Sequence, residues 1–66
     1  MQNRLKIERA IKNLTQDDLA KLIGVSRQTI NSIEKGRYVP STVLALKISE
    51  IFDKPVNEIF ELEDTD

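Results

Sequence analysis

The sequence predicts a small all-α domain of five helices, with residues 1–3 and 60–62 as candidates for a short terminal β pair. Apolar residues recur three and four positions apart in successive segments, which is the period of an amphipathic helix. Ser, Thr, Gly, Asn and Pro stand between these segments, where helices begin and end. A chain of 66 residues that is 39% hydrophobic is sufficient for one small core. We therefore expect a single domain over residues 1–66.

The first helix is predicted over residues 4–12. Asn13 is expected to end this helix, because Asn tolerates the left-handed backbone that a helix C-terminus often needs. The predicted apolar face consists of Ile7, Ala10, Ile11 and Leu14.

The second helix is predicted over residues 16–23. Thr15 is suited to cap it, because a threonine hydroxyl accepts a hydrogen bond from a free backbone N–H of the first turn. Asp17 and Asp18 lie in that turn, where the helix dipole favours carboxylates. Gly24 follows the helix, where glycine relieves a left-handed turn. The predicted buried stripe is Leu19, Leu22 and Ile23.

Three further helices each have a start signal. Ser26 caps the third helix, which Gly36 closes, Ser41 caps the fourth, and Pro55 opens a short fifth. The connection over residues 37–40 ends in a proline, which is incompatible with a continuing helix. The predicted buried side chains are Ile30 and Ile33 in the third helix, Val43, Leu44, Ile48, Ile51 and Phe52 in the fourth, and Val56, Ile59 and Phe60 in the fifth.

The composition excludes several classes of function. The chain has no cysteine and no histidine, so it lacks disulfides, the usual zinc ligands and the usual thiol or imidazole of an enzyme. We therefore expect no catalysis, no metal and no cofactor. No apolar run approaches the roughly 18 residues of a membrane span, and charged residues follow the N-terminus directly. A cytoplasmic protein without a membrane partner or an evident small-molecule effector is expected.

The net charge of −1 conceals an asymmetry along the chain. Residues 1–40 hold eight basic and four acidic side chains, whereas residues 41–66 hold two basic and seven acidic ones. Such a charge dipole can turn one end of a protein toward a polyanion and keep the other end away from it. The pattern favours nucleic acid as a partner, while the acidic C-terminal residues are interpreted as a solubilising tail.

Residues 16–35 have the spacing of a helix-turn-helix unit. Ala20 is small where the two helices approach, Gly24 permits the tight turn, and Val25, Ile30 and Ile33 hold the second helix against the first. A polar helix face alone is typical of simple solvent exposure. The outward face of the second helix of the unit carries side chains with paired hydrogen-bonding groups. Together with the tight turn and the charge asymmetry, this face indicates contact with base edges in a major groove. The outward side chains are Arg27, Gln28, Asn31, Ser32 and Lys35.

Three strings, at residues 14–20, 24–30 and 33–36, resemble the Xre/Cro-type, lambda-repressor-like helix-turn-helix regulators. The resemblance covers residues 4–60 and is strongest to short stand-alone repressors such as the cytolysin-operon repressors. It implies a dimeric, DNA-binding transcriptional repressor without an effector domain. It also implies a structural ion pair between Arg9 and Glu34. Two departures are mild: an asparagine stands at position 13, where glycine is usual, and the acidic pair Asp17 and Asp18 lies near the phosphates, although acidic residues at these positions are common in the family.

The resemblance also assigns contacts to double-stranded DNA. It places Gln16 on a phosphate together with the N-terminal amide of its helix, although a glutamine at this position can also simply be exposed. Arg37 could instead be a solvated loop residue, and Tyr38 could instead cover the core as a lid. The implied base contacts are Arg27, Gln28, Thr29 and Ser32, and the implied sugar-phosphate contacts are Asn31, Lys35, Arg37 and Tyr38.

The large apolar residues near the C-terminus either complete the core or form a patch for a partner. We expect both roles for Ile59, Phe60 and Leu62, with a homodimer formed through the fifth helix and the terminal strand. A twofold dimer would place two recognition helices about 34 to 36 Å apart on an inverted-repeat operator. The alternative function is an antitoxin that binds a toxin protein and its own promoter.

Overall fold

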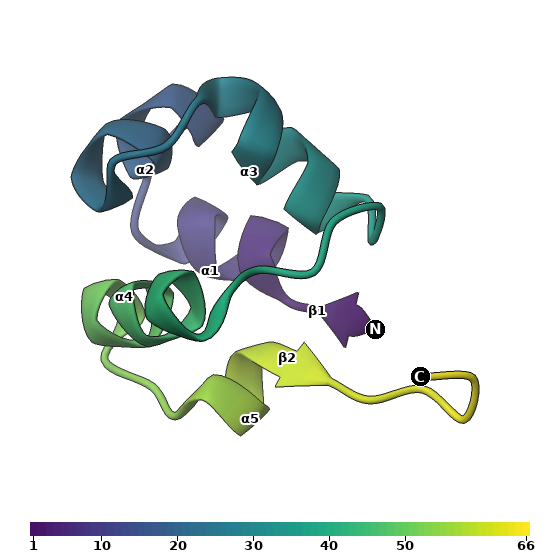
Figure 1. The fold of residues 1–66 in the computed structure, drawn as a ribbon. Helices are drawn as coiled ribbons and strands as arrows, with labels where there is room; N and C mark the ends of the chain where they lie inside the picture. Colours follow the sequence, from purple (N-terminus) through teal and green to yellow (C-terminus); the bar gives the residue numbers. More distant parts are fainter.

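The computed structural model describes residues 1–66 and places five helices between two short strands (Figure 1). The helices are α1 Leu5–Ile11, α2 Gln16–Ile23, α3 Arg27–Glu34, α4 Thr42–Phe52 and α5 Val56–Ile59. Strands β1 (Gln2–Asn3) and β2 (Phe60–Glu61) pair antiparallel, with Gln2 opposite Glu61 and Asn3 opposite Phe60. The predicted five-helix fold with a terminal β pair is confirmed. None of the helices is both long and apolar enough to cross a membrane.

Most helix ends coincide with the predicted capping residues. The Oγ atoms of Ser26 and Ser41 each accept a hydrogen bond from the backbone N–H three residues further on, at 3.1 and 3.2 Å. Asn13 and Gly24 adopt left-handed backbone after α1 and α2, with φ of 58° and 76°. These signals act within one helical turn, which is why the sequence alone locates them.

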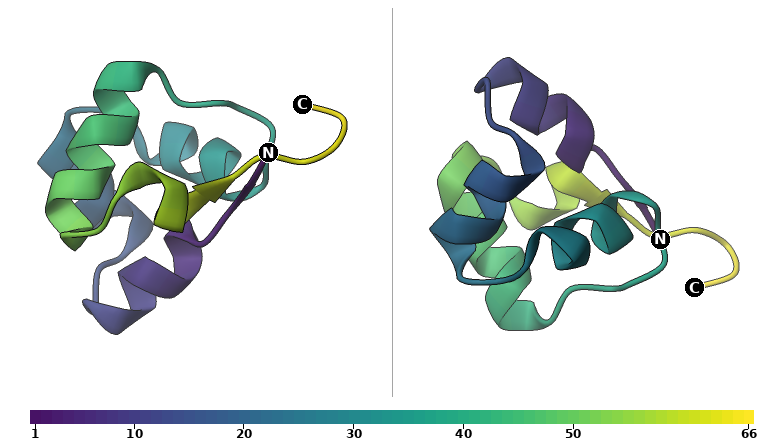
Figure 2. Two further views of the ribbon diagram at one scale, coloured as in Figure 1. Left: turned by 90° about the horizontal axis from the view of Figure 1, so that it is seen from below. Right: turned by 90° about the horizontal axis from the view of Figure 1, so that it is seen from above.

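Helices α2 and α3 form one side of the molecule, and α4 and α5 form the opposite side (Figure 1). The left panel of Figure 2 faces the α4–α5 side and the right panel faces α2 and α3. Between the two sides lies a core of ten buried hydrophobic residues drawn from every helix and from β2. They are Leu5, Leu19, Ala20, Ile23, Ile30, Ile33, Ile48, Phe52, Ile59 and Phe60.

The predicted apolar face of α1 is wrong. Ile7 and Ile11 are 48% and 66% exposed, Ala10 is also exposed and Leu14 is only half-buried. Helix α1 instead turns Leu5 and Glu8 inward, at 0% and 3% exposure.

A contact at the start of α1 accounts for this orientation. The backbone N–H of Arg4 donates to the carbonyl of Ile59 at 2.8 Å, beside the β1–β2 pair, and so orients the first turn. Glu8 lies one turn after Leu5 on the same face. Its carboxylate is compensated by the Lys54 ammonium at 2.9 Å. Tertiary contacts therefore determine which side of α1 faces the core, and the number of apolar residues on each side does not.

Smaller corrections concern the other helices. Leu22 in α2 and Val43 in α4 were predicted to be buried, but both are more than half exposed, and the small Ala20 takes the inward position of α2. Phe60 does not belong to α5, because the backbone becomes extended after Ile59 and Phe60 joins β2. The β pairing thus ends α5 one residue earlier than predicted.

Candidate nucleic-acid interface

Helices α2 and α3 pack against each other around a tight turn, as a helix-turn-helix unit requires. Gly24 adopts a left-handed conformation, and the N–H of Val25 donates to the carbonyl of Ala20 at 3.0 Å. Ala20 is buried at the contact between the helices, and Ile30 and Ile33 fix the inner face of α3 in the core. The outer face of α3 is thereby directed away from the core.

The two acidic residues at the start of α2 are engaged within the protein. Thr15 and Asp18 form a reciprocal capping box, in which each side chain accepts the other's backbone N–H at 3.0 Å. The Thr15 backbone N–H lowers the pKa of the Asp18 carboxyl below its ordinary value. Asp17 pairs with Lys21 at 3.1 Å. Asp18 therefore caps α2, and Asp17 forms a local ion pair on the same helix.

The four predicted base contacts lie on α3 but fall into two groups. Gln28, Thr29 and Ser32 line an open hollow of about 290 Å³, together with Ser26 and Tyr38. Gln28 is exposed, whereas Thr29 and Ser32 are half-buried. The Thr29 hydroxyl also lies 2.9 Å from the hydroxyl of Ser26. Of this group, Gln28 is therefore the most accessible donor and acceptor.

Arg27, the fourth predicted base contact, is the first residue of α3 and directly precedes Gln28 in the chain. It is exposed and borders a wider open hollow between the end of α1 and the start of α2. Gln16, one of the predicted phosphate contacts, lines the same hollow. The structure thus places Arg27 beside the α2 N-terminus and the other three residues beside Tyr38.

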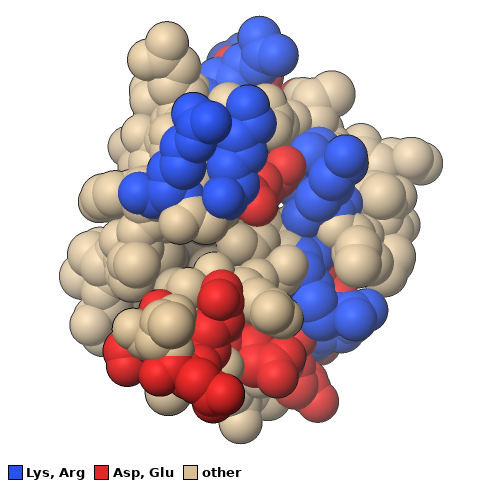
Figure 3. All heavy atoms as spheres, turned by 90° about the vertical axis from the view of Figure 1, so that its right-hand side faces the viewer, with Lys and Arg blue, Asp and Glu red and all other residues tan.

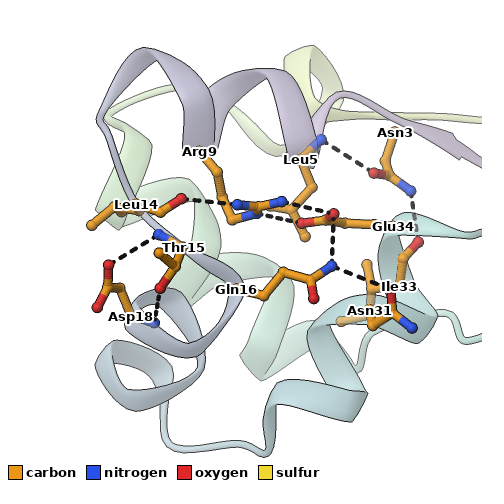
Figure 4. Close-up of polar contacts among 10 residues, drawn as sticks. All are labelled: Asn3, Leu5, Arg9, Leu14, Thr15, Gln16, Asp18, Asn31, Ile33 and Glu34. Atoms are coloured by element: carbon orange, nitrogen blue, oxygen red, sulfur yellow. Dashed lines mark hydrogen bonds and ion pairs between the residues drawn. The ribbon is translucent and has the colours of Figure 1, made fainter.

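The predicted ion pair between α1 and α3 is confirmed (Figure 4). The Arg9 guanidinium donates from Nε and Nη2 to the two carboxylate oxygens of Glu34, and from Nη1 to the carbonyl of Leu14 at 2.8 Å. Hydrogen bonding to Glu34 raises the pKa of Arg9 above its ordinary value. Both side chains are largely buried, so the pair joins α1 to the inner side of α3.

Gln16 has contacts that the sequence did not reveal. Its Nε2 atom lies 3.2 Å from Asn31 Oδ1 and 3.2 Å from Glu34 Oε1, so its amide bridges α2 and α3 (Figure 4). The residue is half-buried, unlike the freely exposed glutamine of the alternative interpretation. Asn31 and Glu34 are 15 and 18 positions away from Gln16, and no helical period relates them to it.

The remaining predicted phosphate contacts follow α3. Lys35 and Arg37 are exposed, and the N–H groups of Arg37 and Tyr38 donate to the carbonyl of Ser32 at 2.9 and 3.3 Å. Tyr38 is 46% exposed, so it does not form a lid over the core. On the face drawn in Figure 3, Lys and Arg lie mostly in the upper and right-hand parts, and Asp and Glu gather mainly in the lower part. The charge asymmetry of the sequence is thus also visible on this face of the molecule.

The residues predicted to form a dimer interface divide sharply in exposure. Ile59 and Phe60 are 1% and 7% exposed and complete the core, whereas Leu62 is 79% exposed. The first two side chains have little surface left for a partner, because β2 turns Phe60 inward. An apolar hollow of about 240 Å³ lies beside them and is lined by Met1, Val39, Pro40, Thr42, Ala45, Leu46, Val56 and Phe60.

Comparison with known proteins agrees with this geometry. A family model described as helix-turn-helix matches residues 5–59. An uncharacterized HTH-type transcriptional regulator of Methanocaldococcus jannaschii is 58% identical over 97% of each chain. Another, from Bacillus subtilis, is 45% identical over 97% of each chain. The solved restriction-modification controller protein C.AhdI from Aeromonas hydrophila has a TM-score of 0.77 and 35% identity over 86% of both chains.

The matched region spans all five helices, including the turn at Gly24 and the ion pair that supports α3. The resemblance to Xre/Cro-type regulators that the sequence strings indicate is confirmed by the family match and by relatives that share nearly the whole length. The chain belongs to the helix-turn-helix family of DNA-binding transcriptional regulators and is not an enzyme.

Proposed function

We propose that the protein is a homodimeric repressor that binds an inverted-repeat operator through α3. The observation that carries the proposal is the outer face of α3. It combines the exposed Arg27 and Gln28 with the hollow at Thr29 and Ser32, on the side of the molecule where basic residues gather. Arg matches guanine and Gln matches adenine by bidentate geometry. Repression would follow from occupancy of a promoter by the dimer.

Sugar-phosphate contacts are assigned to residues around α3. Asn31, Lys35, Arg37 and Tyr38 would set the position of the domain on the duplex without selecting a sequence. The fifth assigned position is Gln16, at the first turn of α2. The backbone N–H groups there have no intrahelical partner, and a phosphate suits the positive end of the helix dipole.

Selection of bound duplexes from a random DNA library tests the function directly. The purified protein should enrich an inverted repeat at ~150 mM salt, where purely electrostatic binding is suppressed. The half-sites should be about 10 base pairs apart, one turn of DNA. If no sequence is enriched, α3 does not read bases and the proposed function is wrong.

Arg27→Ala should weaken operator binding by about 1 to 3 kcal/mol and relax the preference at one base pair, because a bidentate contact to a base is lost. Lys35→Ala is the contrasting variant, since loss of a phosphate contact weakens binding to all sequences alike. Binding titrations on operator and random duplexes separate the two cases. An equal loss on both duplexes for Arg27→Ala would make Arg27 a phosphate contact.

The dimer surface is proposed to combine Leu62 with the apolar hollow at Val39, Leu46 and the edge of Phe60. Leu46→Glu should raise the dimer dissociation constant at least about tenfold, because a buried unpaired carboxylate is costly. Ile11→Glu is the matched control, since Ile11, like Leu46, is more than half exposed but lies on α1, outside the hollow. Sedimentation equilibrium measures both. A wild-type monomer at concentrations that saturate DNA would contradict the dimer.

A further inference from the structure

The network around Gln16 fixes the orientation of two side-chain amides. Glu34 is a carboxylate, which only accepts hydrogen bonds, so the Gln16 amide must turn its nitrogen toward Glu34 Oε1. The same nitrogen lies 3.2 Å from Asn31, so Asn31 must present its oxygen. Arg9 in turn holds Glu34 in place through two further hydrogen bonds. The orientation of Asn31 therefore follows from a chain of contacts that begins on α1.

This orientation has opposite consequences for the two amides. Both N–H groups of Gln16 Nε2 are directed to acceptors within the protein. Asn31 Nδ2 donates to no group of the chain. Every buried side-chain nitrogen or oxygen does have a hydrogen-bond partner, so Asn31 Nδ2 is not among the buried atoms. Asn31 Nδ2 therefore reaches solvent, on the outer face of α3 that carries Arg27, Gln28 and Lys35. It is a free donor with a fixed direction.

We propose that Gln16 is a positioning residue that aims the amide of Asn31 at the DNA backbone. In this proposal Asn31 Nδ2 donates to a phosphate oxygen, and the Gln16 side chain gives no hydrogen bond to DNA. Any phosphate contact at the start of α2 is then made by its backbone N–H groups. The inference rests on the proposed function, because it assigns a partner to α3.

A double-variant cycle on the selected operator tests the coupling. Gln16→Met keeps the length of the side chain but removes both donors, and Asn31→Ala removes the aimed amide. Each variant should weaken binding by about tenfold, as expected for a hydrogen bond to a charged group. The double variant should bind no more weakly than either single variant. Losses that multiply would mean that Gln16 contacts DNA on its own and would overturn the proposal.

Lys35 supplies the matched control for this cycle. It lies at the end of α3, is exposed, and has no ion pair or side-chain hydrogen bond within the chain. The losses from Gln16→Met and Lys35→Ala should therefore multiply. If these losses also failed to multiply, the apparent coupling to Asn31 would reflect a general change of α3, and the positioning role would be rejected.

A measurement on the free protein separates failure of this inference from failure of the proposed function. In the wild-type protein, ¹⁵N relaxation of the Asn31 side-chain amide should give a high order parameter. The value should fall in Gln16→Met and stay high in Lys35→Ala. A value unchanged by Gln16→Met would overturn the inference whether or not any DNA sequence is selected. Enrichment of no sequence, with the expected relaxation change, would instead reject only the DNA assignment.

Asn31→Asp keeps the inference testable if Gln16→Met does not fold. Aspartate retains an oxygen for Gln16 Nε2 but replaces the outward donor with a second acceptor that carries charge. Operator binding should fall at least as much as in Asn31→Ala, while the Gln16 amide resonances stay near their wild-type positions. Binding equal to wild type would show that Asn31 Nδ2 donates nothing to DNA and would overturn the inference.

Discussion

Replacing Arg9 with methionine should lower the free energy of unfolding by about 3 to 5 kcal/mol, because it leaves a buried carboxylate without its charged partner. The Glu34 side chain is only 7% exposed and receives two hydrogen bonds from Arg9. Its one remaining side-chain donor would be the Gln16 amide. Urea denaturation followed by circular dichroism measures the loss.

The double variant Arg9→Met with Glu34→Met provides the control. Replacing both members of a buried ion pair with apolar residues of similar size is often neutral or stabilising, so most of the lost stability should return. The paired design separates the cost of an unpaired charge from a general loss of packing between α1 and α3. A single-variant loss below about 1 kcal/mol would show that Glu34 is solvated and that the pair does not support α3.

Operator binding should weaken about 150-fold as the salt concentration rises from 50 to 200 mM. In the proposed dimer, Lys35 and Arg37 of the two protomers would give four cationic phosphate contacts, and each such contact releases about 0.9 counterion on B-DNA. The neutral contacts proposed for Asn31 and Tyr38 release none. Binding titrations at several salt concentrations give the slope of log affinity against log salt.

Variants assign this slope to residues. Lys35→Ala together with Arg37→Ala should remove most of the salt dependence, because these residues supply the cations in the proposed phosphate contacts. Lys47→Ala is the matched control, since Lys47 is an exposed lysine on α4, on the opposite side of the molecule from α3. If Lys47→Ala lowered the salt slope as much as the double variant does, the DNA would lie on a different face of the protein.

Local signals in the sequence were sufficient for the helix boundaries. Thr15, Ser26 and Ser41 cap the helices that they were predicted to cap, and Asn13 and Gly24 adopt left-handed backbone at the predicted ends. Each signal depends on groups within one turn of the residue itself. The Arg9–Glu34 pair is different, because it joins residues 25 positions apart and was predicted only from the resemblance to a family.

The buried face of a helix was harder to predict where more than one side of the helix could face the core. In α1 the face with more apolar residues is the exposed one, and Glu8 is buried because Lys54 approaches from the loop after α4. Ile59 and Phe60 were expected to serve both the core and a partner, and the fold uses nearly all of their surface in the core. Hydrophobic periodicity measures how apolar a face is, and not which neighbour it meets.

The amino-acid sequence alone determined the five helices, their capped ends and the placement of polar side chains on α3, because these depend on contacts between residues close in the chain. Only the tertiary structure decided which side of α1 is buried and how Gln16 holds Asn31. It also decided that Phe60 closes the core. These features require groups from separate elements to meet at fixed distances, and such distances are set by packing of the whole chain rather than by any local period.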